Sequence, residues 1–180
     1  MDHLCGECIN HKPAFSMARS VGQYKAALLE AIHHFKYGGK TAVGESMGRM
    51  MAAHPFPAIN ARDYSLIVPV PLHPKKLRER GFNQSAILAK ALSGQYAIRI
   101  DFMSLRRLHY TEPQVGLGSK ERERNVRKAF AVDKPDKVEG ERILLVDDVY
   151  TTGSTLRECA RCLMDAGAER VAALTLARAF

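Results

Sequence analysis

The stretch ILLVDDVYTTGST, residues 143–155, places the strongest constraint on how this chain can fold. Four apolar residues run directly into Asp147 and Asp148, and a turn of hydroxyl side chains around Gly153 follows before a helical pattern begins. A short apolar run that ends in a turn and a helix is typical of a buried strand in a parallel sheet. Because strands and helices alternate along the rest of the chain, we expect an α/β fold with a mainly parallel sheet flanked by helices.

Apolar periodicity and turn residues divide the chain into further elements. Asn83 is expected to cap a helix, Gly167 to end one, and residues 106–118 show no regular period and are interpreted as a long loop. A proline-rich turn is expected after residue 70. Expected helices cover residues 21–37, 42–53, 83–92, part of 119–130 and 154–167, and expected strands cover 66–70, 96–105, 129–132, 142–148 and 170–179.

The two acids and the turn after them are expected to lie where ligands bind in an open α/β sheet, beyond the carboxyl ends of the strands. The first N–H groups of the following helix lack intrahelical partners and favour an anion. Gly153 lets the backbone approach a phosphate closely. Hydroxyl donors come from Thr151, Thr152, Ser154 and Thr155.

The two carboxylates narrow the class of ligand that this turn is expected to bind. They repel a phosphate, but they accept hydrogen bonds from sugar hydroxyls, and the turn lacks the lysine of a nucleoside triphosphate P-loop. The pattern therefore predicts a sugar-phosphate site, with the acids on ribose hydroxyls and the loop on the 5′-phosphate. The alternative is a helix N-terminus beside solvated acids at a strand end.

The same stretch resembles the phosphoribosyl pyrophosphate signature of the type I phosphoribosyltransferases. VPVPLHPKKLRERGFNQS at residues 68–85 strongly resembles the ComF/GntX family of competence-associated phosphoribosyltransferase-like proteins, as do FKYGGK at 35–40 and TEPQVGLGSKERERNVRKAF at 111–130. The resemblance covers nearly the whole chain. It implies phosphoribosyl pyrophosphate with Mg²⁺ as ligand. It also implies three parts: a partial zinc-ribbon-like segment at 1–20, a helical hood at 21–60 and a phosphoribosyltransferase-like core at 61–180.

Carried onto this sequence, the resemblance assigns Asp147 and Asp148 to the ribose and residues 151–155 to the 5′-phosphate. The segment after the strand at 66–70 would bind pyrophosphate, with positive charge from Lys75, Lys76, Arg78 and Arg80. Fixed cations stabilise the charge that develops on a leaving pyrophosphate, and Mg²⁺ commonly binds substrate phosphates while keeping several waters. For the basic run taken alone, a solvated turn is the alternative.

The segment from Arg106 to Lys128 is rich in basic residues. A mobile basic loop can close over a polyphosphate and exclude water, which protects an activated sugar from hydrolysis. A charged surface hairpin is the alternative. We expect residues 106–118 to be mobile when no ligand is bound.

Two pairs of cysteines raise the question of zinc. Cys5 and Cys8 form half of a zinc ribbon's ligand set, and His3 and His11 would complete a Cys₂His₂ set with unusual spacing. Members of the ComF/GntX family often begin with a four-cysteine ribbon, of which the first pair is missing here. Two further cysteines, Cys159 and Cys162, share the face of a helix, where cysteine is usually core.

The composition sets the remaining limits. A formal net charge of +8 favours phosphorylated or polyanionic partners. The chain shows neither a signal-peptide core nor an apolar run long enough to span a membrane, so we expect a cytoplasmic protein.

Two functions remain open at this stage. The first is a phosphoribosyltransferase whose acceptor is unknown. The second is a non-catalytic competence protein that senses phosphoribosyl pyrophosphate or binds single-stranded DNA, although the chain has no Trp and only 7% aromatic residues to stack on bases. The sequence does not indicate an oligomeric state.

Overall fold

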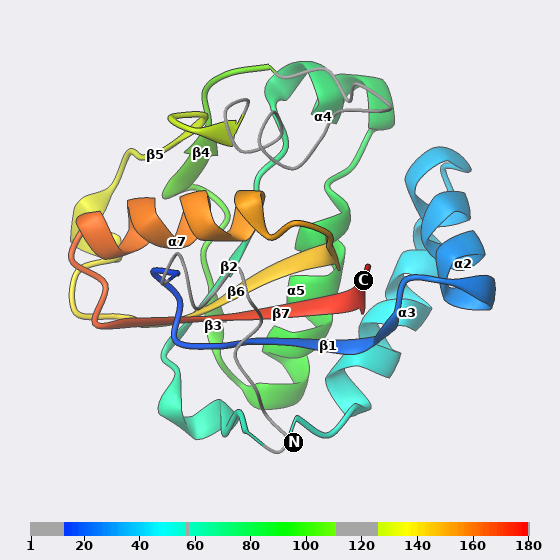
Figure 1. The fold of residues 1–180 in the computed structure, drawn as a ribbon, viewed down its shortest axis with the longest axis horizontal. Coiled ribbons are helices and arrows are strands. Elements are labelled where there is room, and N and C mark those ends of the chain that lie inside the picture. The colour runs from blue at the N-terminus through cyan, green and yellow to red at the C-terminus, as the bar shows by residue number, and fades with distance from the viewer. Residues whose placement is uncertain (1–12, 57, 111–125, 180) are drawn as a thin grey trace.

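A computed structural model describes residues 13–56, 58–110 and 126–179 of the chain. Its centre is a five-stranded parallel sheet in the order β1-β7-β6-β2-β3, and an antiparallel hairpin, β4–β5, forms a second small sheet (Figure 1). The parallel α/β fold expected from the sequence is confirmed. The strands are β1 (Ala18–Gln23), β2 (Leu66–Pro69), β3 (Arg99–Ile100), β4 (Leu105–Arg107), β5 (Phe130–Val132), β6 (Arg142–Tyr150) and β7 (Arg170–Arg178).

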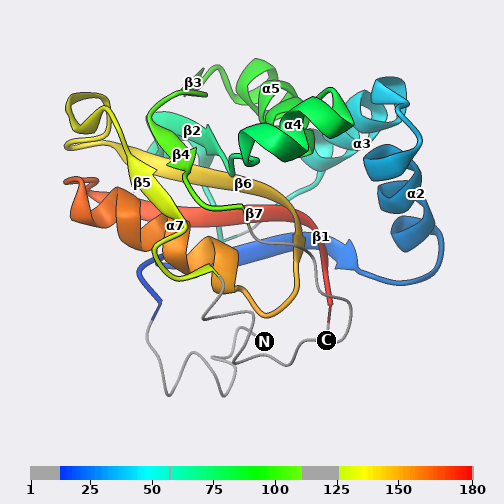
Figure 2. The same cartoon turned by 90° about the horizontal axis from the view of Figure 1, so that it is seen from above.

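Helices cover both faces of the main sheet. Figure 2 shows α7 on one side and α3 and α5 on the other, while α2 lies beyond the end toward which β1 points. Among the described residues, no helix has both the length and the apolar character to cross a membrane. The helices are α2 (Ala26–Tyr37), α3 (Thr41–Ala53), α4 (Pro74–Arg80), α5 (Gln84–Tyr96) and α7 (Ser154–Asp165), with 3₁₀ turns η1 (Ala61–Asp63) and η2 (Pro135–Lys137).

The alternation of side chains along β6 divides the core into two halves. Ile143 and Leu145 pack in the cluster that contains α7, whereas Leu144 and Val146 pack in the cluster that contains α3 and α5. All four are fully buried, as expected for a central strand of a sheet covered on both faces. Because successive side chains of a strand point to opposite faces, the next two residues, Asp147 and Asp148, continue this division.

The bounds of two expected elements, a helix and a strand, are partly wrong. The helix expected at residues 21–37 begins only at Ala26, because residues 18–23 form β1 and pair with β7 at the edge of the sheet. The strand expected at residues 96–105 is reduced to the two residues of β3 and the start of β4. Helix α5 continues to Tyr96, and Asp101 holds a local turn by accepting the N–H groups of Met103 and Ser104. A tertiary partner therefore decided the first difference, and local hydrogen bonds decided the second.

Two segments near the site also differ from expectation. The proline-rich turn after β2 contains the helix α4, which Pro74 begins and His73 caps by accepting a hydrogen bond from the Lys75 N–H (3.2 Å). Arg106 and Arg107, expected in a loop, belong to β4 and pair with β5. The rest of the expected mobile loop, from residue 111 to 118, lies outside the described residues, so its mobility stays a prediction.

The expected division of the chain into three parts also stays a prediction. Strand β1 nonetheless spans the expected junction at residues 20 and 21, and it pairs with β7 from Ala18 to Gln23. Part of the N-terminal region therefore belongs to the main sheet, and the helices α2 and α3 follow it.

Candidate functional site

The two acids lie inside β6, because the strand continues past them to Tyr150. Both side chains are buried, Asp147 with 9% and Asp148 with 4% of its surface exposed. Burying two adjacent carboxylates in a strand costs folding free energy unless each of them has hydrogen-bond or ionic partners. The side-chain partner of each carboxylate comes from a different helix.

Asp147 is held by the beginning of α5. Its Oδ1 accepts a hydrogen bond from the Ser85 hydroxyl (2.8 Å) and another from the backbone N–H of Asp148 (2.9 Å). Burial, and secondarily the charge of Asp148, raise the pKa of Asp147 to about 7. This carboxyl therefore changes its charge close to neutral pH.

Asp148 is held by helix α2. Its Oδ2 lies 2.6 Å from the Lys36 ammonium, and its Oδ1 accepts the backbone N–H of Val149 (2.8 Å). Burial acts to lower the pKa of Lys36, but the charge and hydrogen bond of Asp148 outweigh it, so the pKa lies above its usual value. The site thus contains a charged lysine that neutralises one of its two acids.

The start of α5 connects the acids to β2 and α4. Asn83 caps α5, as the sequence predicted, by accepting a hydrogen bond from the Ser85 N–H (3.0 Å), and its amide donates to the carbonyl of Val70 (3.0 Å). The neighbouring Gln84 accepts a hydrogen bond from Arg80 (2.6 Å). The backbone of Ser85 is therefore held by Asn83, while its hydroxyl donates to Asp147 on β6.

The expected phosphate loop joins β6 to α7. The helix begins at Ser154 after Gly153 and has no side-chain cap. The Thr152 and Ser154 hydroxyls lie 2.8 Å apart, and Thr152 Oγ1 accepts the Ser154 N–H at 3.4 Å, a long contact. Thr151 is exposed and Thr155 is half-buried. The loop therefore presents hydroxyls and the uncapped first turn of a twelve-residue helix.

Gly153 makes this turn sterically possible. Its φ is +76°, a conformation that side chains rarely adopt, and an added Cβ would lie 2.4 Å from the Tyr150 hydroxyl oxygen. Tyr150 in turn lies under the Arg178 guanidinium, 4.7 Å from the ring centre. The turn is thus packed against the ends of β6 and β7.

We expect Gly153→Ala to destabilise the protein by about 1–3 kcal/mol, from backbone strain and the clash with Tyr150. Phosphate affinity should fall as well, because relief of the clash displaces the loop. Urea denaturation and a titration with ribose 5-phosphate measure the two effects. Gly94→Ala in α5 is the matched control, since an added Cβ there meets nothing. Equal behaviour of the two variants would contradict the role given to Gly153.

The predicted pyrophosphate-binding cations all lie on α4, but their side chains take different directions. Lys75 and Lys76 lie over the Tyr110 ring, 4.4 and 5.7 Å from its centre, and Lys76 also pairs with Glu79 (2.8 Å). Arg80 lies 5.5 Å from the ring centre of Tyr37 at the end of α2. Arg78 is exposed. Helix α4 therefore lies between Tyr110, which follows β4, and Tyr37 at the end of α2.

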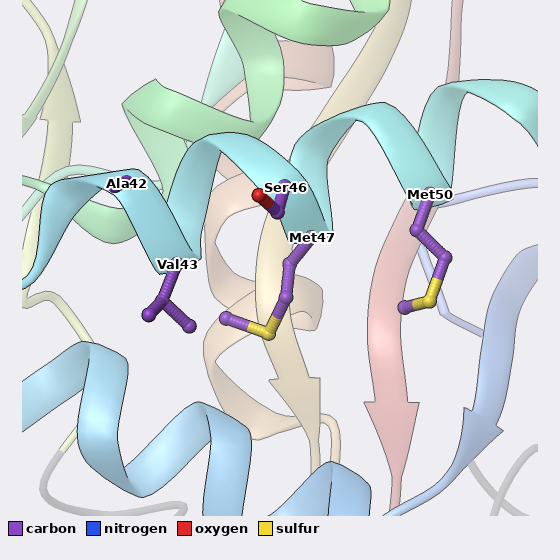
Figure 3. Close-up of a pocket in the computed structure, with 5 residues that line it drawn as sticks. All are labelled: Ala42, Val43, Ser46, Met47 and Met50. Carbon is purple, nitrogen blue, oxygen red and sulfur yellow. The ribbon is translucent and has the colours of Figure 1, made fainter.

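An apolar groove of about 430 Å³ lies along α3 (Figure 3). In Figure 3 the side chains of Val43, Met47 and Met50 point from α3 toward the side on which α2 lies. The groove is lined by Ala42, Val43, Ser46, Met47 and Met50. With one hydroxyl and no charge, this lining suits an apolar group and not a phosphate.

The structure describes only one of the two cysteine pairs. Cys5 and Cys8, with His3 and His11, lie outside the described residues, so their zinc site stays a prediction. Cys159 and Cys162 are buried in the core on α7, and the Cys162 thiol donates to the carbonyl of Phe130 (3.3 Å). Within ranges 13–56, 58–110 and 126–179, no three His, Cys, Asp or Glu side chains gather as metal ligands.

The structure reveals two site residues to which the sequence analysis gave no role. Lys36 falls within the FKYGGK motif and Ser85 within the GFNQS motif, yet neither motif shows which carboxylate its residue contacts. Both contacts join residues that are far apart in the chain, 62 positions in the case of Ser85 and Asp147. The motifs could therefore have indicated that Lys36 and Ser85 belong to the site, but not which carboxylate each of them contacts.

Comparison with known proteins identifies the class of protein to which this chain belongs. Residues 80–179 match the phosphoribosyl transferase domain family. The chain is 33% identical to DNA utilization protein YhgH of Escherichia coli K12, over 98% of this chain and 78% of that protein. It is also 33% identical to competence protein F of Haemophilus influenzae, over 97% and 78% of the two chains.

Two further relatives are more distant or cover less of the other protein. Competence protein ComFC of Bacillus subtilis is 32% identical over 89% of this chain and 63% of that protein. A solved structure of glutamine phosphoribosylpyrophosphate amidotransferase from B. subtilis is 22% identical, with a TM-score of 0.49 over 73% of this chain and 25% of that one. The protein contains a phosphoribosyl transferase domain. It belongs to the ComF/GntX family, which confirms the resemblance seen in the sequence.

Proposed function

We propose that the protein binds phosphoribosyl pyrophosphate between β6, α7 and α4 and transfers its ribose 5-phosphate group. The observation that carries this proposal is the buried acid pair, Asp147 and Asp148, directly before the uncapped start of α7. Carboxylates accept hydrogen bonds from ribose hydroxyls, and the loop offers N–H and hydroxyl donors to the 5′-phosphate. The four cations of α4 supply positive charge for the pyrophosphate.

The acid pair also fits Mg²⁺ carried by the substrate. Carboxylate oxygens are ligands that Mg²⁺ prefers, and one of them, Asp148 Oδ2, already holds a cation in the form of the Lys36 ammonium. Mg²⁺ needs only one or two carboxylates when phosphates and waters complete its shell. Bound in this way, the ion would neutralise charge on the departing pyrophosphate.

In the proposed reaction an acceptor attacks C1 of the ribose while pyrophosphate leaves, through a transition state with oxocarbenium character. The described residues contribute by positioning the ribose and by stabilising the charge that develops, which are the main sources of rate in such transfers. We assign no general base, and the acceptor is left open.

The cations of α4 provide a test of the pyrophosphate subsite. We expect Lys76→Gln with Arg78→Gln to weaken phosphoribosyl pyrophosphate binding by about tenfold or more, since each charge-assisted contact contributes about 1.5–3 kcal/mol. Ribose 5-phosphate, which has no pyrophosphate, should bind almost as before. Calorimetric titration of both ligands gives the comparison.

The matched control removes two lysines near the amino-terminal end of β6, the end opposite the acid pair. Lys134→Gln with Lys137→Gln changes the net charge equally near η2, which precedes β6, and should affect neither ligand. Equal losses for both sugar phosphates in the α4 variant would reject the pyrophosphate subsite.

A second candidate function is binding of single-stranded DNA, and a feature of α4 favours it. The helix brings Tyr37 and Tyr110, from distant parts of the chain, next to Arg80 and Lys75. Tyr37 is 67% exposed. Aromatic side chains beside cations are the elements of single-strand binding surfaces, and the names of the relatives refer to DNA utilization and competence.

The same α4 variant separates the two functions. If α4 contacts DNA phosphates, Lys76→Gln with Arg78→Gln should reduce affinity for an oligonucleotide and lower its log–log salt slope by about 0.7 per lost contact. Fluorescence anisotropy at several salt concentrations measures this slope. An unchanged slope with weaker phosphoribosyl pyrophosphate binding favours the transferase site alone.

A further inference from the structure

Helix α2 makes an apolar contact and an ionic contact that both lie near its end. Only Ile32 and Phe35 are buried on it. Phe35 stacks on Phe82 with ring centres 5.3 Å apart, and it fills the space beside Gly44, where a Cβ would lie 2.1 Å from the ring. Position 44 of α3 therefore requires glycine, because any side chain there would collide with Phe35 of α2.

The residue after this apolar anchor supplies an ionic one. Lys36 reaches from the last turn of α2 to Asp148 Oδ2 at 2.6 Å. The lysine side chain is 20% exposed and the aspartate side chain 6% exposed, so the pair is largely shielded from water. An ion pair in such a position is held strongly, because breaking it leaves an uncompensated buried charge.

This contact places a protein cation on the same carboxylate that the proposed function gives to the ribose and its metal ion. An ammonium and a divalent cation cannot both occupy one side of a carboxylate oxygen at contact distance. Without Lys36, the two adjacent buried acids would be a favourable position for any free divalent cation, because the cation would compensate negative charge that burial makes costly.

We propose that Lys36 is a built-in counter-ion that keeps free divalent cations off the acid pair, so that a cation reaches it only together with the polyphosphate ligand. The inference rests on the proposed function for the identity of that ligand. Lys36 acts as a positioning residue. When the ligand takes Asp148, α2 loses its ionic attachment while the Phe35 contact remains.

The test measures binding of Mn²⁺ alone to the full chain, by electron paramagnetic resonance or calorimetry. Lys36→Met and Lys36→Gln remove the charge, and both should bind free Mn²⁺ at least about tenfold more tightly than the unchanged protein, since an opposite charge at this distance alters a carboxylate's cation affinity by at least that factor. Lys36→Arg keeps the charge and should stay weak. Adding Asp148→Asn to Lys36→Met should abolish the gain.

Lys40→Met is the matched control, because Lys40 lies just after α2 and is exposed. The same gain in this variant would show a general charge effect and overturn the proposal. Unchanged Mn²⁺ affinity in folded Lys36→Gln, judged by circular dichroism, would also overturn it. A separate titration with phosphoribosyl pyrophosphate tests the proposed function, so failure of one is distinguishable from failure of the other.

Discussion

Replacing Asp147 and Asp148 together by asparagine is expected to lower affinity for phosphoribosyl pyrophosphate by at least about a hundredfold. Each carboxylate would lose a charge-assisted hydrogen bond to a ribose hydroxyl, worth about 1.5–3 kcal/mol. The loss should extend to ribose 5-phosphate, which carries the same hydroxyls. This pattern differs from that expected of the α4 variant, which affects the pyrophosphate ligand alone.

Calorimetry with both ligands measures the effect of the double substitution. Asp136→Asn with Glu139→Gln is the control, because it removes two exposed negative charges near η2. Circular dichroism should show that the double variant stays folded, since an asparagine at position 147 can still accept the Ser85 hydrogen bond. Unchanged affinity in a folded double variant would reject the ribose role of the acid pair.

The single substitution Asp147→Asn is expected to stabilise the ligand-free protein, by about 2–4 kcal/mol at pH 8. Burial and the neighbouring Asp148 raise the pKa of Asp147 from 3.8 to about 7, so the folded protein binds this proton more tightly than the unfolded chain. The contribution of Asp147 to stability is therefore largest below pH 3.8 and is lost as the pH rises toward 7. Asparagine removes the buried charge and with it this loss.

The pH dependence distinguishes this cause from a general effect of the substitution. The gain should be largest at pH 8 and shrink steadily as the pH is lowered, which urea denaturation at several pH values measures. Asp148→Asn, one residue further along, should instead destabilise the protein, because it leaves the Lys36 ammonium without its carboxylate. A pH-independent gain for Asp147→Asn would contradict the buried charge as its source.

The expected loss of ligand affinity and the expected gain in stability have the same origin, the buried charge of the acid pair. The acids are retained in β6 although one of them costs stability, which is common where stability and function conflict. The Ser85 hydroxyl and the Lys36 ammonium reduce that cost, each at one carboxylate. Ligand affinity and folding stability should consequently change in opposite directions when Asp147 is replaced.

The sequence alone determined the central strand of the fold and the local structure at the starts of α7 and α5. The apolar run before Asp147 predicts a buried strand, and the residues from Thr151 to Thr155 predict the turn that begins α7. Asn83 was correctly predicted as the cap of α5. These features are local, because they depend on side-chain periodicity, on the freedom of glycine and on hydrogen bonds within a few residues.

The tertiary structure alone decided what depends on contacts between distant segments. Residues 18–23 became a strand because β7 offers them an edge, and the expected helix was shortened accordingly. The acids lie within β6, and their partners are Ser85 and Lys36, which no spacing in the sequence connects to them. A periodic pattern records which side of an element is buried, but not which charge faces it, so the electrostatics of this site followed only from the packing of α2 and α5 against the end of the sheet.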